Sequence, residues 1–123
     1  MSSGVLAEKE LREILQKKGY YVVRSDKSEG LFDLIALRDC PPEAIQVKST
    51  GKDKIYVEKL QRNQMEKLSK EVSVKPIIAA KIKEVWFKCD VCEMNRSDVK
   101  TISERTPKEI CKLINKEDES NGR

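Results

Sequence analysis

The order of its hydrophobic patterns is the feature that most constrains the fold of this chain. Residues 5–18 carry apolar side chains at helical spacing, and Gly19 then ends the pattern as a helix C-terminal cap would. Three runs of strand length follow, and a second helical pattern comes after them, at residues 20–24, 32–37, 44–49 and 58–71. Because a helix between two strands implies a crossover, this order favours an α/β fold with a mixed central β-sheet flanked by helices.

The remaining segments extend this pattern. Residues 77–81 are suited to a buried strand, and residues 85–87 to its hairpin partner. Thr106-Pro107 is a favourable cap and first-turn pair, so we expect one last short helix within residues 103–115. Residues 116–123 are polar and lack apolar anchors, which predicts a disordered tail. The chain of 123 residues is therefore expected to form one domain over residues 1–115.

Histidine is absent, which excludes a Ser-His-Asp triad and a His-ligated zinc. Catalysis would have to use carboxylates, Lys, Cys, or a hard metal ion held by oxygen ligands. Cys89 and Cys92 form a CxxC motif, but Cys40 and Cys111 lie far away and supply no second close pair. Free thiols are therefore the expectation, with a zinc site or a disulfide as the alternative.

Charge and hydropathy restrict the partners of the chain. Its 25 Lys and Arg residues against 21 Asp and Glu residues give a modest formal net charge of +4. No apolar run approaches the roughly 20 residues that a membrane-spanning helix needs. The start Met1-Ser2-Ser3-Gly4 does not have the form of a signal peptide. We therefore expect a cytoplasmic protein without a membrane partner.

The second and third predicted strands carry the residues with chemical potential. Asp33 opens one strand, and Gln46 and Lys48, two residues apart on the next, project from the same face. Asp33 reaches that face if the two strands pair, and Glu8 on the first helix could lean over it. Carboxylates beside a Lys can hold Mg²⁺ and steady the charge of a phosphodiester under hydrolysis.

Taken alone, this pattern is weak, because 37% of the residues are charged. Asp33 could equally be a strand-start cap, and Lys48 a solvated strand residue. Additional motifs follow one another along roughly residues 4–88, and their sequences are Gly4-Val-Leu-Ala-Glu8, Gly19-Tyr-Tyr-Val-Val-Arg24, Phe32-Asp33-Leu, Ile45-Gln46-Val47-Lys48, Lys54-Ile-Tyr56-Val57 and Pro76-Ile-Ile-Ala-Ala-Lys81. In order and spacing they resemble the archaeal Holliday junction resolvases of the PD-(D/E)XK nuclease superfamily.

This resemblance implies a restriction-endonuclease-like fold and a structure-selective DNA endonuclease. Such an enzyme resolves four-way junctions by Mg²⁺-dependent phosphodiester hydrolysis, with Mn²⁺ as a substitute ion. It also implies a homodimer, which suits a substrate with near two-fold symmetry. We expect the dimer contact on the exposed remainder of this sheet-and-helix unit, which includes the apolar residues Ile55, Tyr56, Val85 and Trp86. The stripe of Leu60, Met65 and Leu68 is expected to face the sheet.

The resemblance also implies roles for single residues. Glu8 and Asp33 would be acidic metal ligands, with Gln46 at the third ligand position and Glu8 also contributing to catalysis. Lys48 would be the catalytic lysine, and Ser28 would complete the site from a loop. Lys9 and Arg24 would contact DNA phosphates. The other cations expected at the DNA are in the loops, Lys27, Lys52 and Lys54. Contacts to phosphates carry no base identity, so we expect selectivity for DNA shape.

Gln46 departs from the family pattern, in which this position is Glu. A Gln carbonyl can ligate a metal but brings no charge, which should weaken Mg²⁺ binding. Glu43 has the opposite strand parity and does not compensate. A natural variant, an engineered inactivation and a non-catalytic paralogue that binds junctions all remain open. So does another nuclease of the same fold.

Overall fold

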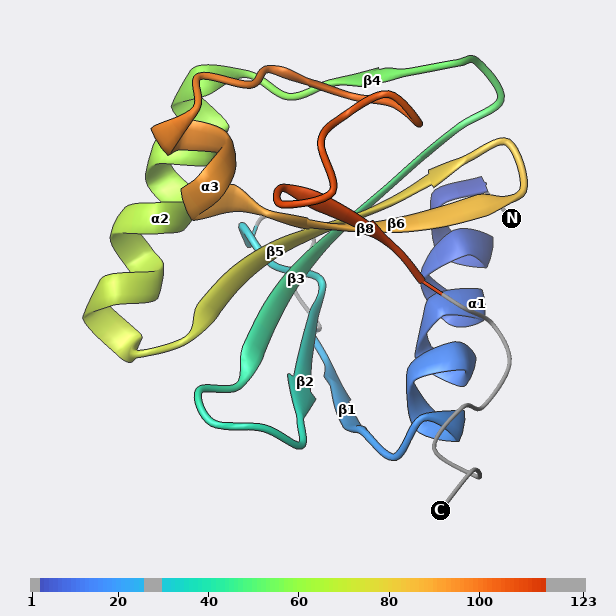
Figure 1. Cartoon of the computed structure of the whole chain (residues 1–123). Helices are drawn as coiled ribbons and strands as arrows, with labels where there is room; N and C mark the ends of the chain where they lie inside the picture. Colours follow the sequence, from blue (N-terminus) through green and yellow to red (C-terminus); the bar gives the residue numbers. More distant parts are fainter. Residues whose placement is uncertain (1–2, 26–29, 115–123) are drawn as a thin grey trace.

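The computed structural model describes residues 3–25 and 30–114 (Figure 1). Its elements, in chain order, are α1 (Ser3–Lys17), β1 (Tyr21–Arg24), β2 (Leu34–Leu37), β3 (Glu43–Thr50), β4 (Ile55–Tyr56), α2 (Lys59–Val72), β5 (Lys75–Ile82), β6 (Val85–Asp90), α3 (Val91–Arg96), β7 (Thr101–Ile102) and β8 (Cys111–Leu113). Both long helices and the main strands lie where their hydrophobic periods predict them.

Six strands form one mixed sheet in the order β1-β2-β3-β5-β6-β8, and β4 pairs with β7 in a second, two-stranded sheet. The β1–β2, β2–β3, β5–β6 and β6–β8 pairs are antiparallel. Strands β3 and β5 are parallel and are joined through α2. This confirms the predicted crossover, because a parallel pair needs a connection long enough to return the chain to the same end of the sheet.

Helix α1 covers one face of the sheet, and α2 and α3 cover the other (Figure 1). On the α1 face, Leu11 and Leu15 pack with Ile45, Ile77 and the 1% exposed Trp86. On the α2 face, a second core contains Met65, Ile78, Met94 and Ile102. Within residues 3–25 and 30–114, no helix is long and apolar enough to cross a membrane.

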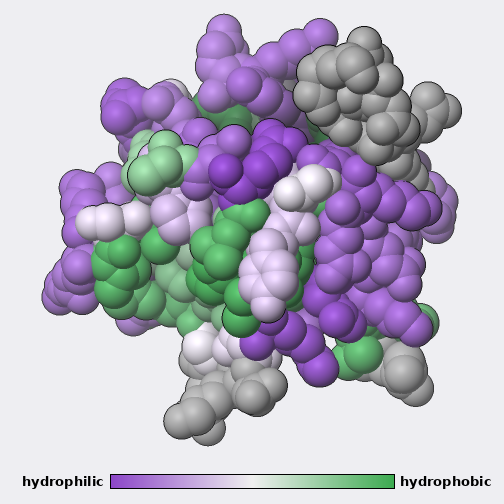
Figure 2. Space-filling model, turned by 90° about the horizontal axis from the view of Figure 1, so that it is seen from below, coloured by the Kyte–Doolittle hydropathy of each residue, from purple (hydrophilic) through white to green (hydrophobic). Residues whose placement is uncertain are grey.

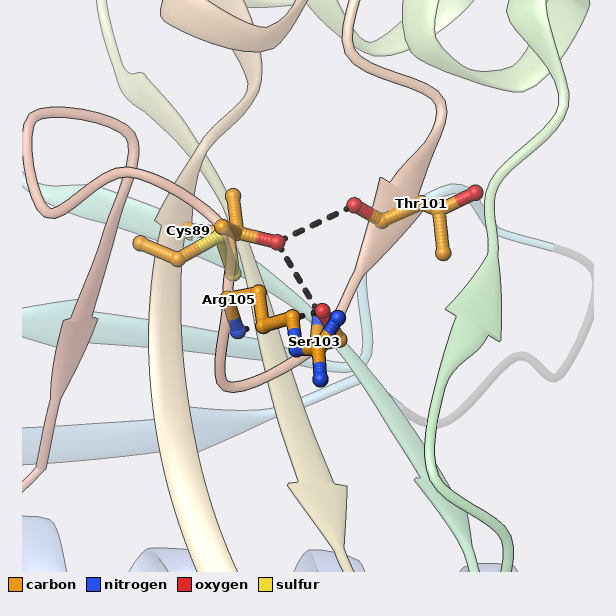
Figure 3. The surroundings of a disulfide bond; sticks show 6 residues. Cys89, Thr101, Ser103 and Arg105 are labelled. Atoms are coloured by element: carbon orange, nitrogen blue, oxygen red, sulfur yellow. Dashed lines mark hydrogen bonds between the residues drawn. A yellow bond between two sulfur atoms is a disulfide. The ribbon is translucent and has the colours of Figure 1, made fainter.

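The prediction of a helix within residues 103–115 was wrong. The chain instead forms β7, a turn and β8, while the short helix α3 precedes them. Thr106 stabilises this turn: its Oγ1 accepts from Ser103 N at 2.9 Å and donates to Thr101 O at 3.2 Å (Figure 3). The tail predicted at residues 116–123 lies outside the described residues.

The expectation of free thiols was wrong for two of the four cysteines. Strands β6 and β8 place Cys89 directly opposite Cys111, and the two form a disulfide with a Cα–Cα distance of 4.0 Å (Figure 3). Cys40 and Cys92 are free. The CxxC motif is therefore divided between a strand and a helix, because Cys92 belongs to α3 and Cys89 to β6.

Candidate active site

Asp33 lies directly before β2 and is hydrogen-bonded to the neighbouring strand β3. Its backbone N–H donates to Ile45 O at 2.7 Å, and its carboxylate Oδ2 accepts from Val47 N at 2.8 Å. The β2–β3 register pairs Leu34 with Ile45, so one further step sets Asp33 opposite Gln46. The carboxylate is thus fixed on β3 between Gln46 and Lys48, as the strand pattern predicted.

Gln46 and Lys48 share the α2 face of β3. Their parallel neighbours on β5 are Ile78 and Ala80, which both belong to the core on that face. Both side chains are half-buried. Among the residues that the structure describes, neither side chain makes a hydrogen bond or an ion pair. A half-buried amide and ammonium without protein partners can be used by a ligand.

Glu8 reaches the same end of the sheet from the opposite face. Its Oε2 accepts from Arg24 Nε at 2.9 Å, and the Glu8 side chain is 17% exposed. Arg24 is the partner of Leu34 in the β1–β2 register, and Ser25 N donates to Asp33 O at 2.9 Å. The structure therefore brings Asp33, Gln46 and Lys48 together, while it pairs Glu8 with Arg24 beside them.

Glu43 does not replace the charge missing at position 46. Its side chain is on the α1 face, where it forms an ion pair with Lys88 and is only 7% exposed. Within residues 3–25 and 30–114, no group of three or more His, Cys, Asp or Glu side chains could hold a metal ion. The oxygen donors at the site are thus the carboxylate of Asp33 and the amide of Gln46, with the Glu8 carboxylate nearby.

The predicted DNA-contacting cations have different surroundings. Lys9 is exposed on α1, beside Glu8 in the chain, and Arg24 is exposed at the end of β1. Lys52 and Lys54 are exposed in the loop between β3 and β4. Lys27 and Ser28, which were assigned to the DNA contact and to the completion of the site, lie outside the described residues.

Lys81 was quoted in a motif but given no role by the sequence. On β5 it neighbours Ser49 of β3, and its Nζ is 2.5 Å from Glu10 Oε1 and 3.7 Å from Glu84 Oε1. The hydrogen bond that Lys81 donates to the Glu10 carboxylate raises the pKa of Lys81, so the ammonium stays charged. It ties α1 to the sheet near the end of the strand that carries Lys48.

The sequence analysis also missed a hollow of about 640 Å³ beside β4, lined by Lys52, Asp53, Lys54, Tyr56 and Thr101. Strand β4 has two residues, and β7, its partner, has two. Such short strands carry no measurable period, so no pattern could indicate them.

Comparison with known proteins identifies the family of this chain. The model of a family described as archaeal Holliday junction resolvase (Hjc) matches residues 1–120. A protein of Methanocaldococcus jannaschii named crossover junction endodeoxyribonuclease Hjc is 35% identical over 74 residues, which are 60% of this chain. That match spans about half of the relative, 55% of its length.

The fold has a counterpart among solved structures. Archaeoglobus fulgidus Hjc, described as a Holliday junction resolvase from an archaeal hyperthermophile, matches with a TM-score of 0.70 and 23% sequence identity. The match covers 84% of this chain and 85% of that one. It confirms the predicted restriction-endonuclease-like fold, with its mixed sheet between helices.

Proposed function

Because the chain belongs to the archaeal Holliday junction resolvase family, we propose that it is an endonuclease that cuts four-way DNA junctions by Mg²⁺-dependent phosphodiester hydrolysis. The observation that supports this most directly is the Asp33 carboxylate, held by Val47 N–H on the strand of Gln46 and Lys48. The proposed substrate is a polyanion. The site combines the Asp33 carboxylate with Lys48, which shares one face of β3 with Gln46.

The donor set fits a hard divalent cation. Asp33 and Gln46 would hold Mg²⁺, or Mn²⁺ in its place, since carboxylate and amide oxygens are the ligands that these ions prefer. When bound, the ion would supply a water of lowered pKa and neutralise charge on the phosphate. Histidine and thiolate ligands are absent from this set, so the site should not select Zn²⁺.

The chain's own residues have separate tasks in this proposal. Asp33 is oriented before any ligand arrives, because its Oδ2 already accepts the Val47 N–H. Lys48 lies on the same face of β3 as Gln46, where its ammonium would stabilise the negative charge that develops on the phosphate. The neighbouring Ala80 leaves room on β5 for the long Lys48 side chain.

Arg24 connects DNA binding with the site. Its side chain is 54% exposed while it pairs with Glu8, so it is open to a DNA phosphate. A phosphate bound by Arg24 competes for the guanidinium and releases the Glu8 carboxylate. We propose that Glu8 joins Asp33 as an acidic ligand in that state.

We also propose that the protein acts as a homodimer through the outer face of β1 and β2. The prediction that Trp86 belongs to this contact is wrong, since that ring is buried in the core. The exposed apolar residues of the two strands are Tyr21, Val23 and Leu37. An apolar area marks the surface at this end of the molecule (Figure 2). Exposed apolar residues of this kind favour association, and a two-fold axis would bring two copies of this surface together.

A junction-binding protein that does not cut is the second candidate, and Gln46 is the observation that favours it. The site has one carboxylate fewer than the family pattern, and Glu43 is paired with Lys88 on the other face. Both candidates bind junctions, so cleavage alone distinguishes them.

The test is a junction assay with the native chain. A labelled four-way junction is incubated with protein and Mg²⁺ in the presence of excess linear duplex of the same sequence. We expect nicks in the junction, inhibition by EDTA, and binding that falls with salt at a log–log slope of about −0.9 per neutralised phosphate. Equal competition by the duplex would contradict shape selectivity. Junction binding without nicks would favour the second candidate.

Lys48→Ala is the control for the chemistry. We expect this variant to lose cleavage and to keep junction affinity, because phosphate contacts elsewhere supply most of the binding. If binding and cleavage fell together, Lys48 would be a phosphate contact and not part of the catalytic set.

A further inference from the structure

The hollow beside β4 is lined by an aromatic side chain, Tyr56, which does not belong to the hydrophobic core. In the two-residue strand β4, Ile55 packs toward the core on the α2 face, whereas the next residue, Tyr56, points outward and is 61% exposed. Its backbone pairs with Thr101 of β7, which lines the hollow with it. The ring is thus presented to solvent on a strand whose other residue is anchored.

The charged residues that line the hollow give it a net positive charge. Asp53 is 2.8 Å from Lys83 Nζ, and this ion pair lowers the pKa of the Asp53 carboxyl. Lys83 N also donates to Thr50 O at 2.8 Å, so the loop is tied to the β5–β6 turn. With Asp53 neutralised by Lys83, Lys52 and Lys54 have no ion-pair partner among the described residues.

From this arrangement we infer that the hollow binds a nucleotide of the junction, with its base stacked on Tyr56 and its flanking phosphates on Lys52 and Lys54. The inference rests on the proposed function and adds a contact that the metal site does not require. An aromatic face next to uncompensated cations is the combination that proteins use for exposed bases, since stacking tolerates any base and cations follow the backbone.

The branch point of a junction is the place where DNA offers such a base. Inside a continuous duplex both faces of each base pair are covered by neighbours, and a ring can enter only if stacking is broken at a cost. At the branch point of an open junction, which forms when no divalent ion is present, stacking between arms is interrupted, so a pair has a face available. Tyr56 would therefore contribute to junction binding and not to duplex binding. This makes it a specificity residue in the loop that follows the Lys48 strand.

A junction with a fluorescent base analogue at the branch point tests this directly. The analogue is quenched when it stacks on an aromatic ring, and EDTA in the buffer keeps the strands intact. We expect quenching when the native protein binds. Tyr56→Ala should abolish the quench and weaken junction binding by about tenfold, equivalent to about 1.4 kcal/mol, while duplex binding stays unchanged. Tyr56→Phe should restore both signals.

Matched controls separate stacking from structure and from end effects. Leu60 is similarly exposed, at 66%, on the neighbouring helix α2, so Leu60→Ala should leave quench and affinity as they are. The analogue placed at the end of an arm should not be quenched. Junction binding without a branch-point quench, or equal quenching at an arm end, would overturn the inference and leave the proposed function intact. Absence of any junction binding would overturn both.

Discussion

At the scale of single residues, position 46 sets the charge of the proposed metal site. Gln46 offers one neutral oxygen where a carboxylate would add an anion. Affinity for hard divalent ions rises with the number of charged ligands. We expect Gln46→Glu to bind Mg²⁺ and Mn²⁺ at least about tenfold more tightly and to cut junctions faster. Isothermal titration of the free protein with either ion measures the first effect.

Glu43→Gln is the matched control for that substitution. This substitution does not change the charge of the proposed metal site, because Glu43 pairs with Lys88 on the α1 face. Metal affinity should therefore remain unchanged, while the melting temperature falls as Lys88 loses its buried ion-pair partner. Unchanged metal affinity in Gln46→Glu would mean that position 46 is not a ligand.

At the scale of elements, the disulfide Cys89–Cys111 attaches β8 to β6. It closes a loop with a sequence separation of 22 residues, and a crosslink of that span is expected to contribute about 3 kcal/mol to the free energy of unfolding. Cys89→Ala with Cys111→Ala should lower that free energy accordingly in urea titrations. Cys40→Ala, at an exposed free thiol, should not.

Thiol counting tests the same pairing without a mutation. Unreduced protein in denaturant should react at two thiols, Cys40 and Cys92, and reduced protein at all four. Four reactive thiols before reduction would contradict the disulfide.

The short elements after β6 show which local signals were present and which were not. Asp90 caps α3, and its Oδ1 accepts from Cys92 N at 2.9 Å and Glu93 N at 3.2 Å. Asp90 and Glu93 have the spacing of a capping box, so this helix had a readable start signal. Thr106-Pro107 has an equally good signal, yet it lies in a turn. Strand β8 follows this segment and pairs with β6. A helix in the segment would therefore have no face of the protein to pack against.

At the scale of the whole molecule, the proposed dimer predicts opposite results for two valines of equal exposure. Val23 on β1 is 43% exposed, and Val85, the first residue of β6, is 42% exposed. Because the proposed dimer is two-fold symmetric, a lysine in place of Val23 would put two new charges into one interface. We expect Val23→Lys to sediment as a monomer with little change in melting temperature.

Val85→Lys is the control and should remain dimeric. Dissociation by Val85→Lys, with Val23→Lys still a dimer, would move the interface to the β5–β6 turn. Native protein that sediments as a monomer at micromolar concentration would contradict the dimer itself.

The sequence by itself determined the long elements and the centre of the site. Helical and strand periods are local, so they located α1, α2 and the main strands without knowledge of their neighbours. The period of two in a strand likewise set Gln46 and Lys48 on one face and Glu43 on the other. Antiparallel pairing of β2 with β3 then brought Asp33 to Gln46, as expected.

Only the tertiary structure decided the contacts between distant segments. These include the Cys89–Cys111 bond, the burial of Trp86, the pairing of Glu8 with Arg24, and the hollow beside Tyr56. Each depends on which strand edge or helix face a segment meets, and strands of two or three residues have too few positions to encode that choice. Their conformation follows from packing against a sheet that has already formed, and so their neighbours in space matter more than their neighbours in sequence.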